Sequence, residues 1–159
     1  MRIIHLFLIT LFFPLITIMQ ATTPTVDPEL ARYAAEVQGV WESYQTASSD
    51  ISGVLRKLAD NPLYLREDAF TQDVKGITWR IRQVTNHLAS IDAPDRVKDI
   101  HDDLINASDT FDVAAFMLDR FAESHDLDDL AAGFELLGAG LALWQQAIDR
   151  LTAIVGPLP

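Results

Sequence analysis

The 159-residue sequence contains no cysteine. Disulfide bonds, thiolate metal ligands, c-type haem attachment, thiol catalysis and lipid attachment to cysteine are therefore excluded. Basic residues are also scarce, because 12 Lys and Arg stand against 23 Asp and Glu and give a formal net charge of −11. Such a chain repels phosphate backbones, so we expect no nucleic-acid partner. The simplest interpretation of the acidity is a solvated, soluble surface.

Motifs that mark common catalytic and cofactor sites are missing as well. The sequence has no GxSxG, no phosphate-cradling glycine loop, no nucleophile–base pattern and no Glu-x-x-His. Asp95, Asp102 and Asp109 repeat every seven residues. They fall at the heptad position expected to be most exposed, where a carboxylate makes a poor general acid or base. We therefore expect a protein that is not an enzyme, with no catalytic residues and no cofactor.

The N-terminus, MRIIHLFLITLFFPLITIMQATTPT, places Arg2 before a long apolar run and a polar stretch of small residues. This layout predicts a secretory signal peptide over residues 1–21, cleaved near Ala21, and then a threonine- and proline-rich linker over residues 22–29. The alternative is an uncleaved anchor, because the run is close to the minimum length for spanning a bilayer. We expect a secreted or periplasmic (cell-envelope) protein, with membrane contact only if the N-terminal segment stays uncleaved.

Apolar residues recur at steps of three and four along the rest of the chain. This coiled-coil-like spacing predicts four helices over residues 30–58, 70–91, 97–121 and 127–155, and no strand-like alternation competes with it. The breaks between them are short and lie at 60–66, 92–95 and 124–126. Short connections between long helices favour antiparallel neighbours. The sequence therefore predicts an all-α, antiparallel up-down-up-down four-helix bundle over residues 30–159, preceded by the signal peptide.

The four apolar series also predict which residues form the core. In the last helix the series is Leu127, Leu130, Phe134, Leu137, Leu141, Trp144, Ile148, Leu151 and Val155. Every core position in the four series is apolar or tyrosine, so we expect no buried acid or histidine. Alanines stand at core positions 47, 107 and 114 and indicate a locally thin bundle with a small apolar cavity or groove. The alternative is that a larger aromatic side chain fills this space.

His101 lies beside the predicted core, next to Asp102 and Asp103. We expect it to be packed at the edge of the core, where it helps to close the hairpin between the second and third helices. The alternative is a metal- or haem-binding bundle that uses His101, with or without His87 and the neighbouring aspartates. A stable transition-metal site needs three or four converging ligands, and His87 falls on the opposite side of the helix pair. We therefore predict no metal site.

Two surface features suggest contact with a partner. Trp79 falls at an outward position beside Arg80 and Arg82, and an exposed tryptophan is typical of a binding surface. The alternative is that the linker after the signal peptide or a loop covers it. The last predicted helix also contains three glycines, at Gly133, Gly138 and Gly140. Glycine is unfavourable inside a helix, so we expect the close approach of a neighbouring helix to compensate. The alternative is that a partner helix or an apolar ligand lies on this face.

One stretch, LASIDAPDRVKDIHDDLINASDTFDVA, contains Pro94, His101, Leu104 and Ala107 at the start of a predicted helix. It resembles small secreted helical-bundle proteins of bacteria whose function is unknown, although Ala93 stands where many of them have a second proline. The resemblance covers about one helix and its entry turn. It implies an exported helical bundle and no catalytic residue.

The leading hypothesis from the sequence is a non-enzymatic secreted or envelope protein that binds a protein partner or a small apolar ligand. The expected contact residues are Trp79, Arg80, Arg82 and His101, or the glycine face of the last helix. The alternative function is the metal- or haem-binding bundle that uses His101.

Overall fold

The computed structural model describes residues 27–156, and this part of the chain is all-helical, as predicted. It has four long helices: α1 (Pro28–Asp60), α2 (Asp68–Ala89), α3 (Lys98–Ser124) and α4 (Leu127–Val155). Two short 3-10 helices, η2 (Pro62–Arg66) and η3 (Asp95–Val97), precede α2 and α3. The described residues contain no β-strand. The signal peptide predicted over residues 1–21 lies outside the described residues, as do residues 157–159.

Helix α1 begins inside the linker that was predicted over residues 22–29. The Asp27 side chain accepts a hydrogen bond of 3.0 Å from the backbone N–H of Glu29 and caps the helix. Pro28 fits the first turn because an N–H at that position would have no partner within the helix. The boundary predicted at residue 30 was therefore two residues too late. The earlier part of the linker lies outside the described residues.

The break predicted at residues 124–126 is confirmed, and its local chemistry explains why it is short. Helix α3 ends at Ser124, and His125 takes the left-handed conformation, with φ of 58°. The Asp126 side chain then accepts a hydrogen bond of 3.0 Å from the backbone N–H of Asp128 and caps α4. Two residues therefore suffice to end one helix and start the next.

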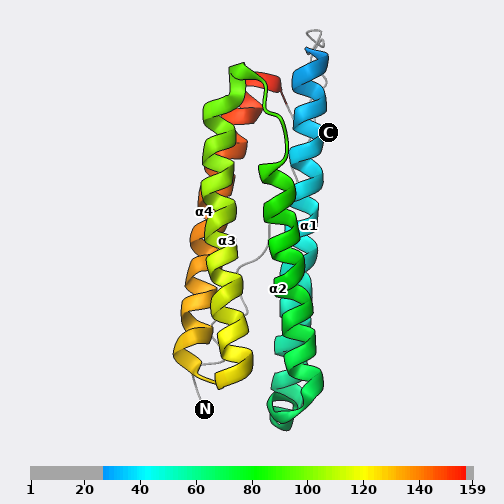
Figure 1. Cartoon of the computed structure of the whole chain (residues 1–159), viewed down its shortest axis with the longest axis vertical. Coiled ribbons are helices and arrows are strands. Elements are labelled where there is room, and N and C mark those ends of the chain that lie inside the picture. The colour runs from blue at the N-terminus through cyan, green and yellow to red at the C-terminus, as the bar shows by residue number, and fades with distance from the viewer. Residues whose placement is uncertain (1–26, 157–159) are drawn as a thin grey trace.

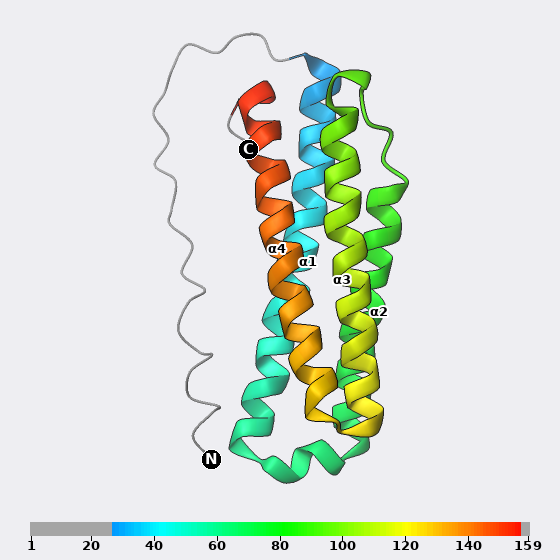
Figure 2. The same cartoon turned by 90° about the vertical axis from the view of Figure 1, so that its left-hand side faces the viewer.

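The four long helices lie side by side with their axes close to a common direction (Figure 1). Helix α1 packs against α2, α2 against α3 and α3 against α4, and α1 also meets α4. The η2 segment crosses one end of the bundle, at the bottom of Figure 2. We call each line of contact between two neighbouring helices a seam. There are four such seams, and they differ in what holds them together.

Helices α1, α2 and α3 bury the face that their sequence predicts. All the predicted core residues of α3 and the turn before it, from Val97 to Phe121, are buried. In α1 the predicted core is buried from Leu30 to Val54, and only Leu58 is partly exposed. In α2 only Val84 of the series is partly exposed. The spacing of apolar residues was therefore a reliable guide to the core in these three helices.

Helix α4 does not bury its predicted face. Of the nine residues in its series, only Trp144 and Leu151 are buried, and Leu127 is 69% exposed. The others are only partly buried: Leu130, Phe134, Leu137, Leu141, Ile148 and Val155. Small residues join the buried face instead: Gly133, Gly140 and Ala147. Because glycine has no Cβ, α4 lies close against α3 along this face, and its larger apolar side chains are left half-covered on the flank toward α1.

The prediction of a core without a buried acid was wrong at Asp129. This residue stands in the first turn of α4, on the face that the glycines turn toward α3. Its carboxylate pairs with the Arg120 guanidinium at 3.2 Å and accepts a hydrogen bond of 3.3 Å from the Ser124 hydroxyl. Both partners belong to the end of α3. A buried charge needs such partners, and here the packing against α3 supplies them.

Candidate functional site

Ion pairs cross three of the four seams. They are Arg80–Asp50 and Lys57–Asp73 between α1 and α2, Lys75–Glu123, Arg82–Asp112 and Arg82–Asp119 between α2 and α3, and Arg120–Asp129, Arg150–Asp99 and Arg150–Asp103 between α3 and α4. Among residues 27–156, no ion pair or side-chain hydrogen bond joins α1 to α4. The α1–α4 seam is therefore held by apolar and aromatic contact alone.

The α1–α4 seam contains a hollow with a volume of about 200 Å³, which we call the larger hollow. From α1 it is lined by Trp41, Tyr44, Gln45, Ala47, Ser48 and Ile51, and from the other helices by Ile81, Phe111, Leu137 and Leu141. Gln45 is exposed and Leu137 and Leu141 are partly exposed, so the rim reaches solvent. An apolar space of this size is large enough to hold a small organic molecule.

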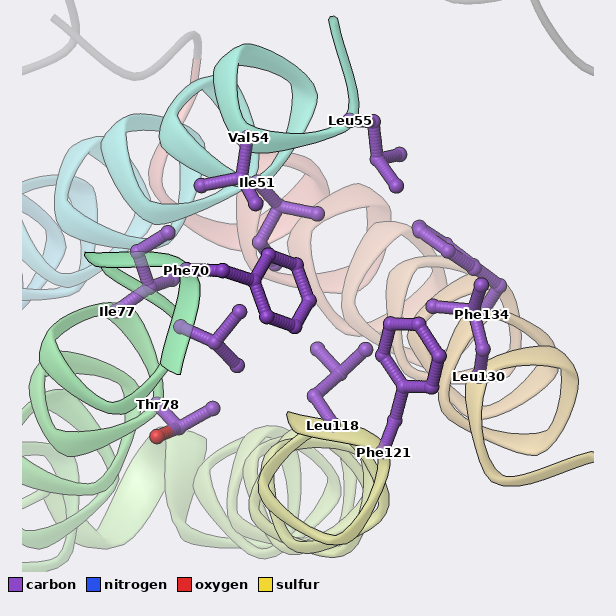
Figure 3. Close-up of a pocket in the computed structure, with 11 residues that line it drawn as sticks. Ile51, Val54, Leu55, Phe70, Ile77, Thr78, Leu118, Phe121, Leu130 and Phe134 are labelled. Atoms are coloured by element: carbon purple, nitrogen blue, oxygen red, sulfur yellow. The ribbon is translucent and has the colours of Figure 1, made fainter. Parts of the chain in front are cut away.

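A second space, the smaller hollow, lies farther along the bundle and has a volume of about 20 Å³. Figure 3 shows Phe70, Leu118 and Phe121 pointing into it, with Leu130 and Phe134 of α4 beside them. Ile51 lines both hollows, so they are neighbours along α1. The smaller hollow has room for little more than one water molecule, so the larger hollow is the candidate site.

The walls of both hollows are free of charge. No Asp, Glu, Lys, Arg or His lines either space, and Tyr44 is the single ionisable residue among the lining residues. Its hydroxyl forms hydrogen bonds of 2.5 Å with the Ser108 hydroxyl and 3.0 Å with the Thr85 hydroxyl. Burial raises the pKa of Tyr44, although these hydrogen bonds oppose the shift. The phenol therefore stays neutral and is already used in tying α1 to α2 and α3.

Aromatic rings form one end of the larger hollow. Trp41 is stacked on Trp144, with ring centroids 5.6 Å apart and an angle of 16° between the planes. Tyr44 packs edge-on against Trp144 at 5.5 Å and lies 4.6 Å from Phe111. Trp144 is buried, and its indole N–H has no acceptor among the described residues. The flat faces of these rings suit contact with an apolar or aromatic ligand.

The position of the larger hollow follows from small residues on both sides of the core. Ala47 lines it, so the cavity predicted from the alanines is confirmed there. Ala107 and Ala114 serve another purpose, because their backbone oxygens face the close approach of Gly140 and Gly133. The short side chains of α3 and α4 thus let these two helices pack tightly. The unfilled space is left on the α1 side.

The sequence predicted a cavity at the alanines, but it did not predict that α4 leaves a half-covered apolar flank beside it. The apolar series of α4 predicts that Leu137 and Leu141 lie in the core. Both are only partly buried, and they form this half-covered flank. The glycine face predicted as a place of close approach is confirmed at Gly133 and Gly140. A Cβ on Gly138 would meet nothing within 4 Å. The combination of a glycine face and a large apolar face on one helix was the signal available.

The structure places Trp79, Arg80 and Arg82 on α2, but it does not bring them into one pocket. Trp79 is 60% exposed. Arg80 pairs with Asp50 of α1 at 2.6 Å, whereas Arg82 turns to α3 and pairs with Asp119 at 2.7 Å. The two arginines therefore join different seams. None of the three residues lines the larger hollow.

His101 contacts α1. Its Nδ1 shares a hydrogen bond of 3.1 Å with the Tyr33 hydroxyl, and the two rings are arranged edge-on. Burial lowers the pKa of His101, and the charge of Asp102 opposes this shift. The sequence placed His101 in the hairpin between the second and third helices. That placement missed α1, because the spacing in one helix gives no information about which distant residue covers it.

The described residues contain no group of three His, Asp or Glu side chains placed to hold a metal ion. His87 is exposed, and Asp103 pairs with Arg150. Metal or haem binding through His101 stays the alternative hypothesis from the sequence alone.

Comparison with known proteins gives no family for this chain: no protein-family model, curated protein or solved structure matches it. The interpretation of the larger hollow therefore depends on its own geometry and chemistry. Among residues 27–156, no helix combines the length and the apolar character that crossing a membrane requires.

Proposed function

We propose that this protein is a non-enzymatic, exported helical-bundle protein that binds a small apolar ligand in the larger hollow. The observation that carries the proposal is an apolar space of about 200 Å³ at the one seam that lacks ion pairs among the residues the structure describes. An engineered, enclosed apolar cavity of about 150 Å³ in another protein binds benzene, and the larger hollow offers similar apolar walls beside an open rim. Binding of an apolar molecule in a space of this kind is therefore favourable.

Export and topology are parts of the same proposal. The support for export is the N-terminal layout of Arg2, an apolar run and small residues up to Ala21, which is typical of a signal peptide. The support for an antiparallel up-down-up-down order is the sequence of cross-helix contacts. They pair Lys57 with Asp73 and Arg80 with Asp50, so residue numbers fall along α2 as they rise along α1. A ligand-binding bundle in the cell envelope fits both features.

A fluorescence titration tests the binding proposal. The probe is N-phenyl-1-naphthylamine, an uncharged dye that fluoresces in apolar surroundings, added to protein purified from its own host. Trp41 lines the larger hollow, so a bound dye accepts excitation energy from it. We expect saturable binding with one dye per chain.

Matched variants locate the bound dye. Ala47→Leu places three more carbon atoms in the larger hollow, and we expect it to weaken binding by about tenfold or more. Ala35→Leu adds the same atoms to an exposed site on α1 and should leave the affinity unchanged. Equal affinities in both variants would show that the dye binds elsewhere, and no saturable binding would contradict the proposal.

A further inference from the structure

The larger hollow lacks charge in a chain in which 22% of residues are charged. The nearest charged side chains along α1 have other partners. Asp50 pairs with Arg80, and Glu42 accepts a hydrogen bond from Gln38. On α4, Glu135 is the charged residue nearest in sequence to the lining residue Leu137 and is exposed, and Asp149 accepts a hydrogen bond from Gln145. The hydrogen bonds from neutral glutamines leave the charges of Glu42 and Asp149 in place, but no charged side chain lines the larger hollow itself.

Two neutral polar side chains stand at the larger hollow, Gln45 and Ser48. Gln45 is exposed and Ser48 is partly buried, and they lie three residues apart on one face of α1. Within residues 27–156 neither side chain is engaged in a hydrogen bond. The amide and the hydroxyl can each donate and accept, so together they suit an alcohol, an ester or an amide.

We infer that the ligand of the larger hollow is an uncharged amphiphile, with its apolar part among Ala47, Phe111 and Leu141 and its polar end at Gln45 and Ser48. The inference rests on the proposed function, because it names the class of molecule for the same site. An ionised carboxylate or ammonium group loses its hydration on entering the hollow and finds no opposite charge there. The net charge of −11 repels an anion further.

A set of three molecules of the same chain length tests this inference. 1-Octanol, octanoate and octylammonium are each used at pH 7 to displace N-phenyl-1-naphthylamine from protein purified from its own host. We expect 1-octanol to displace the dye and both ions to need concentrations about tenfold higher or more. Displacement by either ion at concentrations equal to or below those of the alcohol would overturn the inference.

The remaining outcomes separate the inference from the proposed function. If the dye binds in the larger hollow and none of the three molecules displaces it, the inference is wrong and the proposed function stands. If the dye itself does not bind, both fail.

A charge placed at the rim tests where the polar end lies. Gln45→Lys offers a cation at this point, and we expect octanoate to bind about fivefold or more tightly than it binds the unaltered protein. Gln146→Lys is the matched control, because it changes the net charge equally at an exposed site on α4 that does not line the hollow. Equal gains in both variants would assign the effect to net charge and contradict the placement of the polar end at Gln45.

Discussion

Gly140 determines how closely α4 approaches α3. A Cβ at this position would lie 2.7 and 2.8 Å from two carbon atoms of the Phe111 ring and 3.3 Å from the backbone oxygen of Ala107. Phe111 is buried and packed among other aromatic rings, so it has little room to move. The helix propensity of alanine is therefore outweighed here by the loss of space.

We predict that Gly140→Ala lowers the free energy of unfolding by about 1–3 kcal/mol, because the added methyl group forces the two helices apart. Gly138→Ala is the matched control: nothing lies within 4 Å of its added Cβ. It should raise the free energy of unfolding by about 0.5–1 kcal/mol through helix propensity. Urea denaturation of both variants measures the difference. Stabilisation by Gly140→Ala would mean that the α3–α4 seam is looser than described.

His101 should make stability depend on pH. Burial lowers its pKa below the usual 6.5, so the unfolded chain binds a proton at a higher pH than the folded chain does. Stability then rises with pH between the folded pKa and 6.5, and it is lost as the pH falls through this window. Protonation also makes Nδ1 a donor only, so the Tyr33 hydroxyl must accept in their hydrogen bond.

The predicted result is that the stability gap between the unaltered protein and His101→Gln narrows as the pH falls from about 8 to about 5. Chemical denaturation at several pH values measures this gap. Carboxylates that titrate at lower pH are common to both proteins and cancel in the comparison. A gap that widens on acidification would contradict burial as the main influence on His101.

At the scale of elements, the α2–α3 seam contains the most continuous polar network. The Asp119 carboxylate accepts a hydrogen bond of 2.5 Å from the buried Thr78 hydroxyl and pairs with Arg82 at 2.7 Å. Arg82 also reaches Asp112, at 3.5 Å. The side chain of Asp119 is 22% exposed and that of Asp112 is 47% exposed. The two acids therefore pair with the same arginine in different surroundings.

Asp119→Ala should lower the free energy of unfolding by about 1–3 kcal/mol, because it removes a buried hydrogen bond to a charged acceptor and the shorter of the two ion pairs of Arg82. Asp112→Ala should cost less than about 1 kcal/mol, as exposed ion pairs usually do. Thermal and urea unfolding of the two variants give the comparison. Costs of equal size would show that exposure does not control the strength of this seam.

The spacing of apolar residues predicted most of the fold, and the exception is the buried face of α4. Spacing located all four helices, the 124–126 break and the buried faces of α1, α2 and α3. The spacing was wrong for the buried face of α4. Gly133 and Gly140 pack closely against α3 because they have no Cβ, and a search for large apolar residues does not register them. Asp129 was missed because it lies on the same glycine-containing face, which the apolar residues of α4 do not mark. The larger hollow depends on how far apart helices stand, which no single helix encodes.

For the molecule as a whole, ligand binding should protect one side of the bundle. We predict that a saturating concentration of N-phenyl-1-naphthylamine slows amide hydrogen exchange most in residues 41–51 of α1 and 137–141 of α4. These segments line the larger hollow, and a ligand suppresses the local opening that exposes it. Hydrogen exchange followed by mass spectrometry makes the measurement. Residues 98–106 of α3, none of which lines the larger hollow, serve as the reference, and an equal slowing there would indicate only global stabilisation.

The ion pairs are also unevenly distributed among the four seams. An ion pair links particular atoms of two helices, whereas apolar contact is not directional. Ion pairs of this kind link α1 to α2 and link α3 to α4. The α2–α3 seam joins these two pairs of helices, and the α1–α4 seam is the side without an ion pair among residues 27–156. We therefore expect the helices to separate first along the α1–α4 seam.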